Sequence, residues 1–437
     1  MDLKGKKVAV LGAGSSGLAA AALALSHGAT VSAFDSGDTL RLSPAVERFA
    51  ELGVVLTCGD DALFPSSDYD VSVISPGIDE RWPIARAFSE ASNELIGEVE
   101  FAFRLSEIPV VAITGTNGKT TSKELITSCL SSELETAYTK GNYNNHIGVP
   151  LTLLEINKKH EIGIIEMGAN HKNEINFLCE IAKPNYGIIT NIGKAHLEGF
   201  KNFEGVKSTK KELYDFIKKN NGIIFINNDD KTLNEISDNI KSITYGKNGD
   251  IIGEEVTSSV YTEVLFNKIK INSNLIGSYQ FYNIMLAIAV AQHFSIKEKN
   301  IIKSLESYYP KNNRSQVVQS KSNLIILDAY NANPSSMNEM INSFYKIKKE
   351  GKVCILGDMG ELGIFSKDEH EEIIKLNKKL NLKTFYIGSE FKKLTKKNSF
   401  IDFQEFKNYL KDFPITNSTI LIKGSRSQKL ENIVELL

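Results

Sequence analysis

The chain has 437 residues, of which 42% are hydrophobic and 24% are charged, and its formal net charge is −2. This composition is ordinary for a globular protein, and the length predicts about three domains at roughly 150 residues each. A net charge this close to zero excludes a globally basic nucleic-acid binder. No stretch is apolar for long enough to span a membrane, so we expect no membrane partner.

The N-terminal sequence superficially resembles a signal peptide, because the basic residues 4–7 precede an apolar run. The glycine cluster at 12–17 and Asp35 fit a strand–turn–helix better, so secretion is not expected. The four cysteines are scattered without paired spacing, which suits small core residues in a reducing compartment. We therefore expect a cytoplasmic protein.

Composition changes near position 112. Residues 1–112 carry 8 basic and 16 acidic side chains, whereas the remainder carries 43 basic and 37 acidic ones. Lysine before this point occurs only at Lys4, Lys6 and Lys7, and the later chain is rich in Lys, Asn and Ile. One domain could simply have a different surface. Our hypothesis is that two sequences of different origin join near residues 110–114.

Short apolar runs alternate with helical segments, which predicts an α/β protein with doubly wound parallel sheets. In chain order, strands are expected at residues 7–11, 30–34, 71–75, 109–114, 162–166, 186–190, 222–226, 324–327, 352–356, 384–387 and 419–422. The clearest helices are expected at 17–27, from about 120, and at 277–294, with a linker at 308–313. We predict three domains: Rossmann-like at 1–108, P-loop ATPase-type at 109–311, and Rossmann-like at 312–437.

The strongest motif is TGTNGKTT at residues 114–121, directly after an apolar strand. Successive loop amides and the N-terminus of the next helix form a cradle for anions. Lys119 is expected to reach the β- and γ-phosphates of a nucleotide, and the Thr120 hydroxyl to ligate Mg²⁺. Ile113 stands where the general pattern has its first glycine. The motif predicts ATP binding through Gly115, Thr116, Asn117, Gly118, Lys119, Thr120 and Thr121.

The spelling of this loop resembles that of the Mur ligases and their folylpolyglutamate synthetase relatives. Seven further segments, in order, resemble the branch that adds D-Ala-D-Ala (MurF): NYNNHIGVP at 142–150, EMGAN at 166–170, NIGKAHLEGF at 191–200, KKELY at 210–214, DAYNANP at 328–334, LGDMGELG at 356–363 and KGSR at 423–426. The resemblance covers about residues 109–437. It implies that ATP activates a carboxylate as an acyl phosphate, which an amine then attacks to form an amide.

The resemblance also implies a metal site. Phosphoryl transfer needs charge neutralisation, which two Mg²⁺ ions bound by hard oxygen ligands and an imidazole would supply. Glu166, His196 and a carbamylated Lys210 are the candidate ligands besides Thr120. The alternatives are a plain strand-end glutamate, a structural histidine and a lysine on a solvated helix face, and neighbouring lysines leave the lysine assignment open.

Other positions match nucleotide and amine contacts of the family. Asn283 matches an asparagine that contacts adenine, although Tyr279 stands where relatives often have His. Arg314 and Asp328 match residues that the third domain brings to ATP when it closes. The incoming amine could be contacted by Asn331, Asn333, Ser335 and Ser336, which equally fit turn and N-cap chemistry.

The first domain resembles a different branch. Its G-x-G-x-x-G spacing at 12–17 follows a strand, and Asp35 ends the next strand, so NAD binding is a rival prediction. With SPGI at 75–78 and IGEVE at 96–100, the segment resembles the D-glutamate-adding branch (MurD). That resemblance implies a UDP-sugar site lined by Gly14, Ser15, Ser16, Asp35, Ser36 and Gly77. Asn145, from the NYNNHIGVP segment, is also expected at the UDP-substrate site.

We therefore predict a monomeric ligase that joins D-Ala-D-Ala to a UDP-N-acetylmuramoyl (UDP-MurNAc) peptide. Two alternatives stay open: a D-Glu ligase acting on UDP-MurNAc-L-Ala, and a MurD–MurF chimera that folds and binds ATP with little ligation. A folylpolyglutamate-type ligase is disfavoured by the EMGAN and NNHIGVP spellings. A catalytically poor scaffold built from ligase domains is the remaining class.

Overall fold

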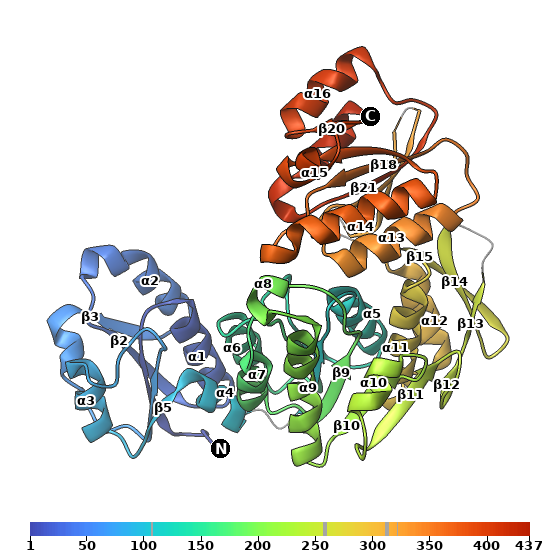
Figure 1. The fold of residues 1–437 in the computed structure, drawn as a ribbon. Helices are drawn as coiled ribbons and strands as arrows, with labels where there is room; N and C mark the ends of the chain where they lie inside the picture. Colours follow the sequence, from blue (N-terminus) through green and yellow to red (C-terminus); the bar gives the residue numbers. More distant parts are fainter. Residues whose placement is uncertain (106–107, 257–259, 311–313, 321) are drawn as a thin grey trace. The chain divides into compact units, whose positions relative to one another are not determined.

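The computed structural model describes residues 1–105, 108–256, 260–310, 314–320 and 322–437 (Figure 1). These residues form two compact units. The first unit consists of residues 1–113, 133–168 and 176–186, and the second of residues 114–132, 169–175 and 187–437. The linker expected at 308–313 and the junction expected near 312 fall partly on residues 311–313, which lie outside the described part of the chain.

The first unit begins with a five-stranded sheet in the order β3-β2-β1-β4-β5, with every neighbouring pair parallel. Its fully buried strand residues alternate between the two faces, and Phe34 packs on Phe88 of the covering helix α3 at 4.5 Å between ring centroids. The elements are β1 (Lys7–Leu11), α1 (Ser15–Ser26), β2 (Thr30–Asp35), α2 (Thr39–Glu51), β3 (Val55–Cys58), β4 (Val71–Ile74), α3 (Pro83–Glu90), β5 (Leu95–Gly97) and α4 (Glu98–Leu105).

Three more parallel strands of the first unit pair in the order β6-β8-β7. The strands β6 and β8 are buried along their whole length, which explains why they read as uninterrupted apolar runs. This part contains β6 (Val110–Thr114, whose last residue belongs to the second unit), β7 (Thr136–Tyr138), α6 (Gly148–Leu154), β8 (Ile162–Glu166) and most of α7 (Glu174–Ala182).

The second unit contains the strands β12-β11-β10-β9 in that order and an antiparallel meander β13-β14-β15. The long helix α11 is buried on nearly all sides and packs against α5. The elements are α5 (Lys119–Leu130), β9 (Tyr186–Ile189), α8 (Leu197–Phe200), α9 (Phe203–Lys219), β10 (Ile223–Asn227), α10 (Lys231–Ile236), β11 (Ser242–Gly246), β12 (Ile251–Ile252), β13 (Glu254–Val256), β14 (Tyr261–Phe266), β15 (Ile269–Ile276), α11 (Gln280–His293) and α12 (Glu298–Ser307).

Residues 314–437 of the second unit, the C-terminal region, form a six-stranded sheet in the order β16-β17-β21-β18-β19-β20, in which only β16 is antiparallel. Side chains of successive strand residues enter different cores, because strand side chains alternate between faces. Ile326, Cys354 and Leu421 belong to a core with residues of α13 and α14. Ile325, Ile355 and Ile422, each next to one of these in sequence, belong to a second core with residues of α16. The two sets of helices lie on opposite sides of the sheet (Figure 1).

The elements of the C-terminal region are β16 (Gln316–Gln319), β17 (Leu324–Asp328), α13 (Pro334–Lys346), β18 (Lys352–Gly357), α14 (Ser366–Lys379), β19 (Lys383–Ile387), α15 (Ser389–Leu394), β20 (Ser399–Phe400), α16 (Phe403–Asp412) and β21 (Thr419–Lys423). The mixed α/β fold with parallel sheets is confirmed, and the eleven expected strands occur within one or two residues of their expected bounds. Within the described residues, no helix has both the length and the apolar character needed to cross a membrane.

Candidate functional site

The TGTNGKTT segment at residues 114–121, here called the phosphate loop, connects the end of β6 to the N-terminus of α5, which begins at Lys119. Two glycines make its path possible. Gly115 has φ +148° and Gly118 has φ +76°, both in the left-handed half of backbone space that disfavours side chains. A Cβ on Gly115 would also lie 2.0 Å from Thr190 Oγ1. The two glycines therefore let the chain turn sharply from β6 into α5, whose N-terminus is the kind of helix end that binds anions.

The residues after β9 hold this loop in place. The Thr190 hydroxyl donates to the Asn117 carbonyl at 2.6 Å, and the Thr116 amide donates to the Asn191 carbonyl at 3.1 Å. The Asn191 side chain bonds Asn117 twice, accepting from its amide at 2.9 Å and donating to its carbonyl at 3.0 Å. These bonds fix the backbone path of the loop before any ligand arrives, and they use the amides of Thr116 and Asn117 to do so.

The C-terminal region contacts the same loop. Asn333 donates from Nδ2 to Asn117 Oδ1 at 3.0 Å. The Ser335 hydroxyl accepts from the amide of Lys194 at 2.8 Å, and the Lys194 ammonium pairs with Glu369 at 2.6 Å. These contacts lie within the second unit, so the phosphate loop and the C-terminal region form one continuous candidate site.

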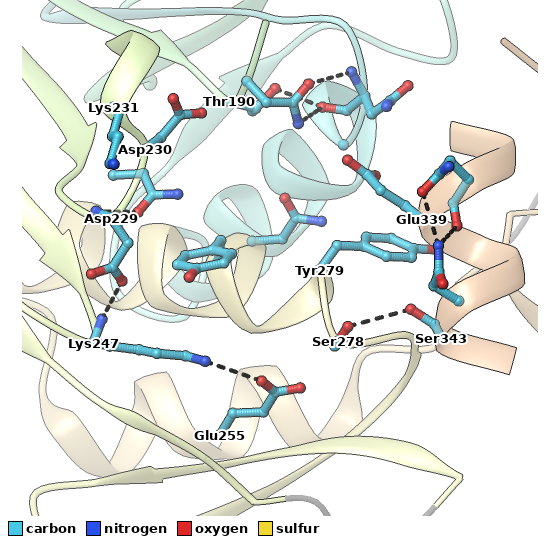
Figure 2. A pocket seen from close by; sticks show the side chains of 18 of the residues that line it. Thr190, Asp229, Asp230, Lys231, Lys247, Glu255, Ser278, Tyr279, Glu339 and Ser343 are labelled. Carbon is cyan, nitrogen blue, oxygen red and sulfur yellow. Dashed lines mark hydrogen bonds and ion pairs between the residues drawn. The ribbon is translucent and has the colours of Figure 1, made fainter. Parts of the chain in front are cut away.

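Two cavities adjoin the loop, and both are lined by Asn117, Gly118, Tyr279 and Glu339. The larger one has about 640 Å³, a size typical of small-molecule sites, and extends past Asn283 to Asp229 and Lys247. The smaller one has about 130 Å³. Figure 2 shows the larger cavity, where Ser278 and Ser343 face each other with their hydroxyl oxygens 3.3 Å apart.

The smaller cavity holds the two residues that were expected to reach ATP from the C-terminal region. Arg314 lies over the ring of Tyr330 at 3.8 Å, and Asp328 pairs with Lys423 at 2.6 Å. Lys119 lines the same cavity. The structure therefore places Lys119 and Arg314, the two predicted phosphate-binding cations, at one cavity. The sequence analysis noted the KGSR segment at 423–426 but did not name Lys423 as a site residue.

Tyr279 and Glu339 stand where the two cavities meet. The Tyr279 hydroxyl lies 3.1 Å from the Ser315 hydroxyl oxygen, and burial raises the pKa of this phenol far above its usual range. Burial also raises the pKa of Glu339 to about 7, while the Lys423 charge and Asn117 act in the opposite direction. Glu339 was missed by the sequence analysis, because nothing in its helix pattern distinguishes it from a surface carboxylate.

Lys210 of α9 is 3% exposed, and its Nζ lies 3.3 Å from the hydroxyl of Thr114, the first residue of the phosphate loop. The buried placement argues against the solvated-helix alternative.

Asn283 accepts from the Ser122 hydroxyl at 2.9 Å and donates to Gln280 at 2.7 Å, so its amide braces α5 against α11 while lining the larger cavity.

His196 follows β9 and pairs through Nδ1 with the carboxylate of Glu361 from the C-terminal region. The hydrogen bond from His196 lowers the pKa of Glu361, and the charges of His196 and Lys119 act in the same direction. Within the described residues, no group of three or more His, Cys, Asp or Glu side chains is placed to hold a metal ion.

Two predicted site residues, Glu166 and Asn145, lie in the part of the first unit that holds β6, β7 and β8. Glu166 ends β8, is 1% exposed, and accepts from Asn144 Nδ2 at 2.8 Å. Asn145 precedes α6, and its Oδ1 accepts from the amides of Ile147 at 3.1 Å and Gly148 at 3.0 Å. The structure therefore shows Asn145 holding the turn that leads into α6.

The glycine turn between β1 and α1 is also in the first unit. The Asp35 carboxylate accepts from the Ala13 amide at 2.8 Å and the Gly37 amide at 2.9 Å, so it holds the turn in place. A Cβ on Gly17 would lie 2.0 Å from the Gly12 carbonyl oxygen, which explains the close spacing of glycines. Beside the turn, Glu98 is 1% exposed, bonds Ser75, and has its pKa raised by burial.

The four candidate amine-site residues divide into caps and contacts. Asn333 and Ser336 form the capping box of α13. Asn331 accepts the Ala332 amide on its own side chain and the Lys423 ammonium on its carbonyl at 3.3 Å. Asn333 nevertheless also contacts the phosphate loop, so the cap positions the start of α13 against the nucleotide site.

Comparisons with known proteins identify the family of the chain. Residues 113–291 match the model of the Mur ligase middle domain, and residues 313–408 match that of the Mur ligase, glutamate ligase domain. The chain belongs to the Mur ligase family.

Among relatives, the chain is 33% identical over 344 residues to the UDP-N-acetylmuramoyl-tripeptide--D-alanyl-D-alanine ligase of Bacillus subtilis, covering 75% of each protein. It is similar to a crystal structure of MurF from Acinetobacter baumannii, with 25% identity, a TM-score of 0.70 and coverage of 85% of this chain and 90% of that one. A pseudomurein peptide ligase type C from Methanothermus fervidus shares the fold over 98% of this chain and 99% of its own, with 21% identity and a TM-score of 0.72.

Proposed function

We propose that the protein is an ATP-dependent ligase of peptidoglycan precursor synthesis, which joins D-Ala-D-Ala to a UDP-MurNAc-peptide through an acyl phosphate. The observation that carries this proposal is the phosphate loop at residues 114–121, which lines the smaller cavity together with Arg314 and Asp328 of the C-terminal region. The relative from Bacillus subtilis, which bears the name of that activity, supports the choice of amine and acceptor.

In the proposed reaction, Lys119 and Arg314 bind the phosphates of ATP from opposite regions of the chain. The substrate carboxylate attacks the γ-phosphorus, the bond to the bridging oxygen breaks, and ADP leaves. The C-terminal region covers the site and excludes water from the acyl phosphate. The amine of D-Ala-D-Ala then attacks the acyl carbon, phosphate leaves, and the amine loses its proton.

Mg²⁺ prefers hard oxygen ligands, which the Thr120 hydroxyl, the Glu166 carboxylate and a carbamate on Lys210 would supply. We propose Thr120, Glu166, His196 and Lys210 as the residues that would hold it, and the ion would neutralise charge on the transferring phosphoryl group. Lys210 would serve as a carbamate, formed when its neutral amine adds to CO2 and loses a proton. Its burial supports this, because the charge of a lysine ammonium is costly to bury.

For the first unit we propose a UDP-sugar site at the glycine turn, in a Rossmann-like domain of residues 1–108. The parallel strand order β3-β2-β1-β4-β5 and the open space at Gly14 and Gly77, where a Cβ would meet nothing within 4 Å, support this placement. We keep the MurD-like origin of this segment as part of the proposal, on its glycine turn and its acidic composition. The fold itself requires no artificial fusion, since the ligase from Methanothermus fervidus shares it along nearly the whole chain.

A cytoplasmic location completes the proposal, and the free state of Cys58, Cys129, Cys179 and Cys354 is consistent with a reducing compartment. The test is phosphate release from ATP and Mg²⁺ with UDP-MurNAc-L-Ala or UDP-MurNAc-tripeptide, each paired with D-Glu or D-Ala-D-Ala. We expect turnover with tripeptide plus D-Ala-D-Ala and its loss in Lys119→Ala. Turnover only with UDP-MurNAc-L-Ala and D-Glu would overturn the substrate assignment.

A further inference from the structure

His196 lies in the segment that follows β9, and Glu361 lies in the loop that follows β18. The contact between the two residues joins these segments. The imidazole Nδ1 pairs with the Glu361 carboxylate, and the Glu361 carbonyl accepts from the Glu198 amide at 3.2 Å. Side chain and backbone of one residue therefore both hold the segment that carries His196. The pair is half open to solvent, with side-chain exposures of 29% for His196 and 58% for Glu361.

Both partners have an unusual backbone conformation. His196 has φ +50° and Glu361 has φ +58°, in the left-handed region that residues other than glycine seldom adopt. Strain of this kind persists where the surroundings impose it and is frequent at functional sites.

Occupation of Nδ1 has a chemical consequence for the other ring nitrogen. A carboxylate that accepts from Nδ1–H fixes the tautomer in which Nε2 has a free lone pair. Metal-ligating histidines commonly have this arrangement, and removal of the supporting carboxylate typically lowers metal affinity or activity by 10- to 100-fold.

We propose that Glu361 is a positioning residue for His196, and that it orients the imidazole so that Nε2 is available to the Mg²⁺ of the nucleotide site. This inference rests on the role of His196 in the proposed function. Because Glu361 belongs to the C-terminal region, the imidazole is fixed only while that region lies against residues 196–198. The metal site is then completed in the same step in which the C-terminal region closes against residues 196–198.

A second ion pair offers a matched control. Lys194 and Glu369 also join the segment after β9 to the C-terminal region, at 2.6 Å, without touching the imidazole. If Glu361 only helped to close the two regions, its removal and that of Glu369 would have equal effects. If it positions His196, only its removal changes the response to Mg²⁺.

The experiment measures binding of a fluorescent ADP analogue as Mg²⁺ is titrated, in the full-length wild type, Glu361→Ala, Glu361→Gln, Glu369→Ala and His196→Ala. We expect Glu361→Ala to raise the Mg²⁺ concentration for half-maximal binding about 10-fold or more, and Glu361→Gln, which keeps an acceptor, to raise it less. Glu369→Ala should stay within about twofold of the wild type. Combined with His196→Ala, Glu361→Ala should add nothing, because both act through one imidazole.

Equal shifts in Glu361→Ala and Glu369→Ala, or additive effects of Glu361→Ala and His196→Ala, would overturn the proposal. In steady-state assays, Glu361→Ala should lower kcat more than it raises KM for ATP. The binding readout needs no ligation, so the two proposals fail separately. If the wild type forms no amide but Glu361→Ala still shows the expected shift in Mg²⁺ concentration, only the proposed function is refuted.

Discussion

Asp328 and Lys423 face each other at the carboxyl ends of two neighbouring parallel strands, β17 and β21, where they are register partners. Their Oδ2 and Nζ atoms are 2.6 Å apart, and the side chain of Lys423 is 2% exposed and that of Asp328 15%. The other carboxylate oxygen accepts from the Ser315 amide at 3.1 Å. The pair thus ties the segment beside Arg314 to the sheet and forms a wall of the smaller cavity.

Removal of one partner of this pair should destabilise the fold. Lys423→Met leaves the largely buried Asp328 carboxylate without its cation, and such a change typically costs about 3 kcal/mol. Urea unfolding of the variant and the wild type measures this difference. Lys393→Met, which breaks a pair whose lysine is 68% exposed, is the control and should change stability much less. Equal losses in both variants would contradict the prediction.

Glu339 should make stability depend on pH. Its pKa in the fold is about 7, raised by burial from 4.5, so the folded chain holds a proton that the unfolded chain releases between about pH 4.5 and 7. Stability therefore falls as pH rises through this window, by at most about 3 kcal/mol. Glu339→Gln should be more stable than the wild type at pH 8, and the difference should shrink toward pH 5 in denaturant titrations. A difference that is independent of pH would refute the assignment.

Lys210→Ala should lower ligation by about 100-fold if the residue acts as a carbamate in the metal site. Amide formation, measured by chromatography of the product, should also fall in the wild type when CO2 and bicarbonate are removed, and recover when bicarbonate returns. Lys211→Ala is the matched control, because this neighbour is 40% exposed and pairs with Asp215 on the helix surface. Unchanged activity in Lys210→Ala would exclude the role.

Gly118→Ala should weaken nucleotide binding by about tenfold, since a Cβ there would lie 2.7 Å from Asn283 Oδ1 in addition to the strain of φ +76°. Equilibrium binding of labelled ADP tests this. Gly141→Ala is the control for a left-handed glycine outside the phosphate loop: its φ is +54°, and a Cβ there meets nothing within 4 Å. It should retain nucleotide affinity, and an equal loss in both variants would show that the effect is not specific to the loop.

Apolar runs and glycine motifs predicted the strand pattern well, because buried parallel strands such as β6 and β8 must be apolar along their whole length. Elements with a weaker local signal were not predicted. The antiparallel meander β13–β15 alternates between exposed and buried residues, and the edge strand β16 spans only Gln316–Gln319. Their formation depends on the pairing of neighbours in space more than on their own composition.

By itself, the sequence determined the phosphate loop and the residues that follow it, because backbone geometry imposes glycine and a helix N-terminus at fixed spacing there. Only the tertiary structure decided which distant side chains meet at this loop. The contacts Asp328–Lys423, Lys194–Glu369 and His196–Glu361 each join residues far apart in the chain. Charge pairs of this kind leave no periodic trace in a sequence, since their geometry depends on how sheets and helices pack and not on local spacing.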